Sequence, residues 1–105
     1  MPRQVRRRYL ALKMVTKGSV SRKDLLTAIW NAIIQLFGEY GASKTDLAMI
    51  KYKPREGYAI LRCSQKAHEK VKASIASITE IEGAPAAIHI QKVSGTLKGL
   101  CKRAS

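Results

Sequence analysis

The sequence is poor in the residues that build metal sites, secretory segments and membrane spans. Its 105 residues include only two cysteines, Cys63 and Cys101, and their spacing matches no common metal-binding motif. We expect both to be free thiols in a reducing compartment. No apolar run approaches the ~20 residues that a membrane-spanning helix needs. The opening segment 1–8 is basic but lacks the apolar stretch of a signal peptide. These absences predict an intracellular protein, cytoplasmic or, in a eukaryote, nuclear and nucleolar, with no membrane partner.

Catalytic signatures are equally scarce. His68 and His89 have no cysteine or acidic partner at metal-ligand spacing, so surface positions explain them better than ligation or general-base roles. There is no glycine-rich phosphate loop of the Walker or dinucleotide type. A small ferredoxin-like hydrolase such as an acylphosphatase needs an asparagine beside a phosphate-binding loop, yet Asn31, the only asparagine, falls in a predicted helix. We therefore predict no catalytic residues, no metal ligands and no cofactor bound by the protein.

Acidic residues are few and confined to the middle of the chain. Twenty lysines and arginines stand against seven acids, a formal net charge of +13, and all seven acids lie between Asp24 and Glu82. The acid-free ends, 1–23 and 83–105, hold eight and four basic residues, and thus twelve of the thirteen net charges. A surplus of this size implies an anionic partner, and we favour nucleic acid over a membrane surface. For either end alone, a solvated tail is the alternative.

Alternating apolar residues predict four strands, at 8–15, 47–53, 57–63 and 86–93. In the first strand, Leu10, Leu12 and Met14 share one face, while Tyr9, Ala11 and Lys13 take the other. The segment 54–57 has proline and glycine where a tight turn needs them.

Two helices separate these strands. One is predicted over 22–37, with Ser21 and Asp24 as its capping pair and Gly38 as its end. The other is predicted to begin at a Ser64 cap and to stop at Gly83 and Pro85. The resulting order, βαββαβ, favours an α+β split sandwich of the ferredoxin-like or RNA-recognition-motif type. It has an antiparallel sheet with both main helices on one face. We treat 1–105 as one domain with a basic N-terminal arm (1–7) and a basic C-terminal tail (94–105).

The usual strand order of this fold, 4-1-3-2, brings the two basic ends together. The fourth strand runs antiparallel beside the first, so the end of one lies next to the start of the other. We therefore expect the N-terminal arginines to converge with the C-terminal basic residues on one RNA-binding surface. Its predicted basic residues are Arg3, Arg6, Arg7, Arg8, Lys13, Arg62, Lys92, Lys98, Lys102 and Arg103.

Aromatic side chains on the exposed sheet face are sparse. RNA-recognition motifs stack bases on aromatic residues of their two central strands, where this chain has Tyr9 and Tyr58. Ile60 and Cys63 occupy places where the motif would normally carry further aromatics. Stacking contributes about 1–3 kcal/mol per base, so its loss favours contact with phosphates or with protein over sequence-specific reading of single strands. For both tyrosines, packing on the sheet surface is the alternative to base contact.

The first helix has more apolar surface than one sheet can cover. Its predicted core stripe consists of Leu25, Ile29, Ala32, Ile33 and Leu36. A second stripe on the adjacent face consists of Leu26, Trp30, Ile34 and Phe37. Exposed tryptophan and phenylalanine usually mark a protein interface, so we predict contact with a partner subunit or a second copy. The alternative is a helix wrapped by the loop at 39–46.

Several segments together resemble the archaeal and eukaryotic ribonuclease P protein component 2 family. They are Arg-Tyr-Leu at 8–10, Phe-Gly-Glu-Tyr-Gly at 37–41, Gly-Tyr-Ala-Ile-Leu-Arg-Cys at 57–63, and Val-Ser-Gly-Thr-Leu-Lys at 93–98. Their order and spacing cover nearly the whole chain. The short chain resembles the archaeal members of the family more than the eukaryotic ones.

The resemblance implies a subunit of the ribonucleoprotein that removes the 5′ leader from precursor tRNA. In this family the RNA performs the Mg²⁺-assisted cleavage, and the protein supports the catalytic domain together with ribonuclease P component 3. The implied partners are the catalytic RNA, precursor tRNA, component 3 and other ribonuclease P proteins, together with self-association. Residues at family positions are Arg8, Tyr9, Arg62 and the 94–98 segment, so RNA contact is expected for Ser94, Thr96 and Lys98 as well. A free-standing RNA-binding module or ribosome-associated factor is the alternative.

Overall fold

The computed structural model describes residues 6–16, 18 and 20–96, which form one curled sheet and a helical layer. The elements are β1 (Arg7–Thr16), α1 (Arg22–Ser43), β2 (Ala48–Lys53), β3 (Tyr58–Ser64), α2 (His68–Ala76), β4 (Glu80–Ile81) and β5 (Ala84–Ser94). The strands lie in the order β2-β3-β1-β5-β4, and every pair is antiparallel. The predicted α+β class and the 4-1-3-2 order are thus confirmed, with β5 as the fourth long strand and β4 as an addition.

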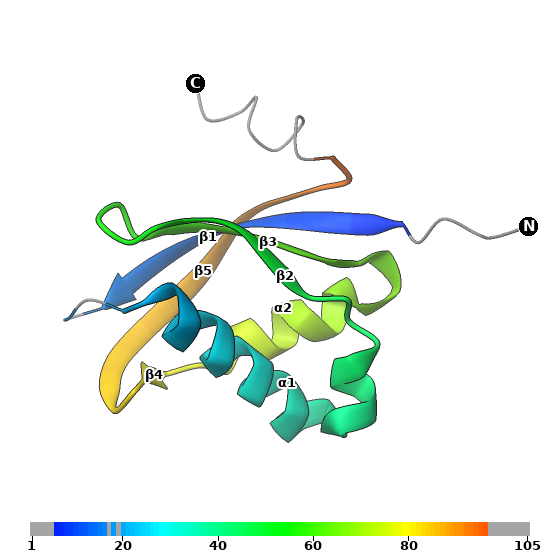
Figure 1. The fold of residues 1–105 in the computed structure, drawn as a ribbon, viewed down its shortest axis with the longest axis horizontal. Helices are drawn as coiled ribbons and strands as arrows, with labels where there is room; N and C mark the ends of the chain where they lie inside the picture. The colour runs from blue at the N-terminus through cyan, green and yellow to red at the C-terminus, as the bar shows by residue number, and fades with distance from the viewer. Residues whose placement is uncertain (1–5, 17, 19, 97–105) are drawn as a thin grey trace, which may run out of the picture.

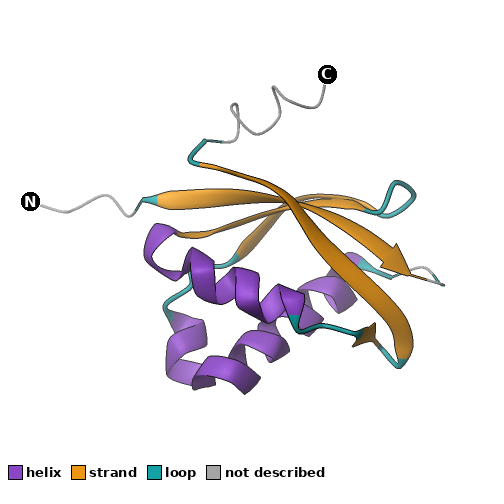
Figure 2. Cartoon of the chain, turned by 180° about the vertical axis from the view of Figure 1, so that it is seen from behind, coloured by secondary structure: helices purple, strands orange, loops and turns teal. Residues whose placement is uncertain are grey.

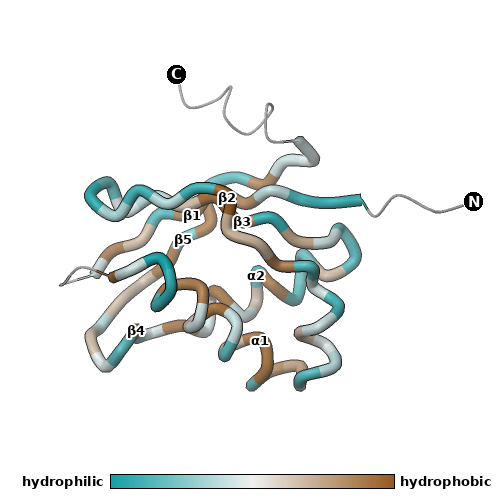
Figure 3. The backbone as a smooth tube through the Cα atoms, viewed as in Figure 1, coloured by the Kyte–Doolittle hydropathy of each residue, from teal (hydrophilic) through white to brown (hydrophobic). Residues whose placement is uncertain are grey.

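Both helices cover the same face of the sheet and leave the other face without a described helix (Figures 1 and 2). The core lies between the two layers, and the hydrophobic segments of the chain gather there (Figure 3). From β1 it takes Leu10, Leu12 and Met14, as the alternation predicts, and from α1 it takes Leu25 and Ile29. Burying these side chains contributes about 1.5–3 kcal/mol each. The helix-free face is therefore available for contacts outside the chain.

α1 begins where the sequence predicts, is interrupted at the predicted end, and continues beyond it as a second short run. The Ser21 hydroxyl accepts a hydrogen bond from the Asp24 N–H over 3.1 Å, which confirms the cap. At Gly38 the backbone leaves the helical region (φ 79°, ψ 169°), but a second helical run then continues to Ser43. The helical run that begins at Arg22 therefore ends at Gly38, as predicted, and the short run beyond this kink, which the sequence did not predict, places Ala42 almost fully buried in the core.

Leu36 also departs from its prediction, since half of its surface is exposed instead of lying in the core. α1 runs away from the sheet from its start to its bend, after which the chain turns back (Figures 1 and 2), so Leu36, near the bend, lies outside the core.

The second helix is shorter than predicted at both ends. Ser64 belongs to β3, and its hydroxyl donates to the Lys44 carbonyl at 3.2 Å instead of capping the helix. A 3₁₀ turn, Gln65–Ala67, precedes α2. Beyond α2 the chain forms β4, whose Glu80 pairs with Pro85 of β5. Pro85 does not stop a helix as predicted but lies at the start of a strand, a position that proline tolerates.

Candidate nucleic-acid interface

The helix-free face of the sheet carries its side chains in three rows that cross the strands from β2 to β5. Strand register fixes these rows, because residues directly opposite each other in antiparallel strands point to the same face. The first row is Lys53, Tyr58, Lys13, His89; the second is Lys51, Ile60, Ala11, Lys92; the third is Ala48, Arg62, Tyr9, Ser94. No row contains an acid, and each contains at least one lysine or arginine. This face, which we call the basic sheet face, is suited to a polyanion.

The two basic ends of the chain meet at the edge of this face. Tyr9 near the start of β1 pairs with Ser94 at the end of β5. A guanidinium nitrogen of Arg8 lies beside Gly95, 3.5 Å from the place that a Cβ would occupy there. The start of β1 and the end of β5 are therefore side by side, as predicted. Arg8, however, lies opposite Cys63 of the core and so points to the helical side of the sheet, whereas Lys92 pairs with Ala11 on the outer side. Four residues predicted for this surface, Arg3, Lys98, Lys102 and Arg103, lie outside the described part of the chain.

The arginines of the predicted surface differ in their partners. Arg7 donates to the Asp46 carboxylate over 2.9 Å, and both side chains are about two-fifths exposed. For Arg8 and Arg62, the Nε–H group is buried without an acceptor among the described protein atoms. Within the described chain an acid thus neutralises Arg7, whereas Arg8 and Arg62 form no ion pair with an acid there. An unpaired guanidinium is well suited to bind phosphate.

The β2–β3 turn holds one side of this face in place. The Lys13 ammonium donates to the Glu56 carbonyl over 2.7 Å, and the Met14 N–H donates to the Gly57 carbonyl over 2.6 Å. The predicted tight turn is confirmed, since the Gly57 N–H donates to the Pro54 carbonyl over 3.2 Å. These bonds fix Lys13 and the adjoining Tyr58 relative to each other.

Sequence reasoning missed two lysines of this face, Lys51 and Lys53 on β2, both exposed. Their signal was available, because they alternate on the predicted strand 47–53 and point the same way. Placing these lysines beside Tyr58 also requires knowing that Lys53 pairs with Tyr58 across the sheet, and the strand register shows this pairing.

The second apolar stripe of α1 is only partly exposed. Leu26 and Ile34 pack against the core, whereas Trp30 and Phe37 keep 37% and 36% of their surface exposed. The Lys70 ammonium lies 5.5 Å from the centre of the Phe37 ring. Tyr40, which the sequence did not single out, is 76% exposed just beyond the bend of α1. Trp30, Phe37 and Tyr40 all belong to α1, in the helical layer, so they are separate from the basic sheet face.

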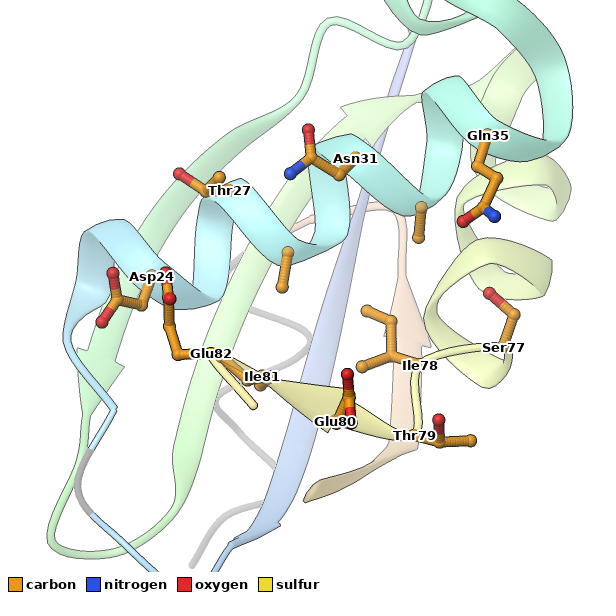
Figure 4. Close-up of a pocket in the computed structure, with 12 residues that line it drawn as sticks. Asp24, Thr27, Asn31, Gln35, Ser77, Ile78, Thr79, Glu80, Ile81 and Glu82 are labelled. Atoms are coloured by element: carbon orange, nitrogen blue, oxygen red, sulfur yellow. The ribbon is translucent and has the colours of Figure 1, made fainter. Parts of the chain in front are cut away.

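A hollow of about 380 Å³ lies between α1 and the segment 77–82, in the helical layer (Figure 4). Asp24, Glu80 and Glu82 line it, and the described part of its lining includes no lysine or arginine. Like charges repel, so this hollow is unsuited to nucleic acid. The open sheet face is therefore better suited to a polyanion than the hollow is.

Two described residues with reactive or titratable side chains, Cys63 and His68, have surroundings typical of structural residues. Burial, reinforced by the Asp46 carboxylate, raises the pKa of the Cys63 thiol to about 11, so this cysteine stays protonated and unreactive near neutral pH. His68 contacts the Gln65 carbonyl and Glu69. Among the described residues, no three histidine, cysteine or acidic side chains gather closely enough to hold a metal ion. None of the described helices has the length and apolar character needed to cross a membrane.

An antiparallel sheet with its long strands in the order β2-β3-β1-β5 and two main helices on one face defines an α+β fold like that of ferredoxin-like and RNA-recognition-motif domains. The sequence model of the Rpp14/Pop5 family matches residues 8–105. The chain therefore belongs to the Rpp14/Pop5 family.

Archaeal relatives of the chain are named Ribonuclease P protein component 2. The protein from Methanosarcina barkeri is 32% identical over 95 residues, 90% of this chain and 69% of its own length. The protein from Pyrococcus furiosus is 31% identical over 98 residues, 93% of this chain and 82% of its own length. Among solved structures, a chain in the cryo-EM structure of yeast ribonuclease MRP superimposes with a TM-score of 0.74. That match covers 99% of this chain and 95% of the yeast chain at 12% identity, which establishes the shared fold.

Proposed function

We propose that this chain is a protein subunit of ribonuclease P that supports the catalytic RNA as it removes the 5′ leader from precursor tRNA. Membership of the Rpp14/Pop5 family and the component 2 relatives support the subunit role. One structural observation supports the RNA-binding part, namely the acid-free rows of basic side chains on a sheet face that no described helix covers. A free-standing RNA-binding module, the alternative, has no observation in its favour.

The proposed mechanism is electrostatic. Where helices of a folded RNA approach one another, their phosphates repel, and a protein that neutralises them releases counterions and lowers the free energy of the compact RNA. Lys13, Arg62 and Lys92 belong to the rows and supply this positive charge. Phosphate contacts of this kind position an RNA without reading its bases. The protein thus acts by stabilising a fold of the RNA, and the chemistry of cleavage stays with the RNA.

Mg²⁺ enters this proposal as a ligand of the RNA. When bound there, it activates the attacking water and stabilises the leaving oxygen. The protein supplies no comparable donor set in its described part, where acids and histidines do not gather in threes. The contribution of the chain is to neutralise phosphates around that centre.

The proposed protein partners are ribonuclease P component 3, other ribonuclease P proteins and a second copy of this chain. Trp30 and Phe37 on α1, about a third exposed, supply the aromatic side chains typical of such contacts, and Leu26 and Ile34 continue the stripe towards the core. This stripe is on the helical layer and the RNA surface is on the sheet, so one molecule can bind both partners together.

The deciding experiment is isolation of the native complex. The tagged chain is purified from its own cells, the bound RNA is sequenced, and the complex is tested on precursor tRNA with Mg²⁺. The proposal expects ribonuclease P RNA as the main bound RNA and release of the 5′ leader. Recovery of ribosomal RNA alone, without leader cleavage, would support the free-standing module instead.

A further inference from the structure

The centre of the basic sheet face is apolar and covered by neighbouring side chains. Ala11 on β1 and Ile60 on β3 are cross-strand partners there, and only 5% and 1% of their surfaces are exposed. No described helix lies over this face (Figure 2). Tyr9, Ile50 and Tyr58 pack against the pair and are the side chains that cover it. The two tyrosines therefore belong to a small second core on the outer side of the sheet.

This arrangement removes the usual platform for unpaired bases. Single strands stack their bases on aromatic rings at the middle of the two central strands. That position holds Ala11 and Ile60 here, and the rings of Tyr9 and Tyr58 come from the rows on either side and cover them. The centre is thus apolar, without an aromatic pair of its own.

The lysine and arginine side chains of this face lie around the apolar centre and not along a single line. Lys51 and Lys92 stand at the two ends of the middle row, on β2 and β5. Three inter-strand spacings separate their backbones, about 14 Å. Lys13 and Arg62 lie in the rows on either side, on the central strands. The basic side chains therefore border the centre on opposite sides.

We infer that the basic sheet face binds paired RNA through its two sugar–phosphate backbones and not through unpaired bases. A groove that follows one backbone suits a single strand, whereas charges on both sides of an apolar centre suit the two backbones that border the wide, shallow minor groove of A-form RNA. The inference rests on the proposed function, in which the chain binds RNA, and specifies the form of RNA.

The test compares the full chain on three probes of one sequence, namely an RNA duplex of about 16 base pairs, its separated strands, and the matching DNA duplex. Dissociation constants are measured over a range of salt concentrations. The variant pair Lys51→Gln and Lys92→Gln removes the charges at both ends of the middle row. The matched control pair, Lys23→Gln and Lys66→Gln, removes the same charge from the helical layer. Circular dichroism establishes that each variant is folded.

We expect the RNA duplex to bind more tightly than the single strands and the DNA duplex. In the sheet-face variant the salt slope for the duplex should fall by about two, and in the control it should keep its value. Replacing both Tyr9 and Tyr58 with leucine should leave single-strand affinity unchanged. Tighter binding of single strands, lost in the leucine variant, would overturn the inference and leave the proposed function intact. Failure to bind any RNA probe or ribonuclease P RNA itself would overturn both.

Discussion

Replacing Gly57 with alanine should destabilise the protein far more than a glycine substitution in a similar but open turn. Gly57 has a positive φ of 63°, and a Cβ built on it would lie 2.4 Å from the Met14 carbonyl oxygen. That oxygen is backbone and part of β1, so it cannot turn aside as the end of a side chain can. The turn itself must move by about 1 Å to restore ordinary van der Waals contact.

The magnitude has two contributions. A side chain held at positive φ costs roughly 1–2 kcal/mol, and overpacking against a rigid neighbour costs a further 1–3 kcal/mol or so. Moving the turn also stretches the hydrogen bond from the Met14 N–H to the Gly57 carbonyl. The free energy of unfolding should therefore fall by about 2–5 kcal/mol.

Gly83 provides the matched control. It too has a positive φ, 79°, but nothing lies within 4 Å of the place for its Cβ. Gly83→Ala should cost only the conformational part, roughly 1–2 kcal/mol. Urea unfolding of the wild type and both variants measures the three free energies. Equal losses in the two variants would refute the idea that contact between the turn and β1 fixes Gly57.

Three further predictions concern charge, titration and the apolar stripe. Arg7→Ala should lower the free energy of unfolding by at most about 1 kcal/mol, because its ion pair with Asp46 is partly exposed; a double-mutant cycle with Asp46→Ala measures the coupling, and a coupling of about 2 kcal/mol or more contradicts it. Because burial raises the pKa of Cys63 from 9.0 to about 11, the folded state holds a proton there that the unfolded state releases, so stability should fall between about pH 9 and pH 11. Urea unfolding of the wild type and of Cys63→Ala over this pH range measures the effect, because the variant should lack this fall. Identical pH profiles for the two proteins would contradict the prediction. Trp30→Ala should leave the fold intact and weaken co-purification of protein partners, whereas unchanged recovery of every partner in the folded variant would argue against the interface.

The long strands could be predicted because each alternates between a buried and an outward face. Leu10, Leu12 and Met14 show that alternation in the sequence and lie in the core. The two-residue strand β4 has too few residues for any period, and it forms because the turn at Gly83 returns the chain onto β5. Ser64 looks like a helix cap in the sequence, but its hydroxyl is bonded to Lys44, twenty residues away in the chain.

The sequence predicted those features of the basic sheet face that follow from strand order alone. It missed the features that depend on which side chains are neighbours across the sheet. The pairing of β1 with β5 places Tyr9 beside Ser94, as the topology requires. Alternation marks Ala11 as outward, yet its burial depends on the tyrosines that cover it, which no local pattern reveals. In the same way, Arg7 and Asp46 are 39 residues apart, so their ion pair has no signal in spacing or composition.

Lysine footprinting of the binary complex tests most directly the claim that RNA lies on the basic sheet face. Acetylation rates of individual lysines are measured by mass spectrometry for the full chain alone and bound to ribonuclease P RNA. The account predicts that Lys51 and Lys92 become protected, while Lys23 and Lys66 in the helical layer keep their rates. Protection of Lys23 and Lys66 with unchanged rates at Lys51 and Lys92 would contradict it.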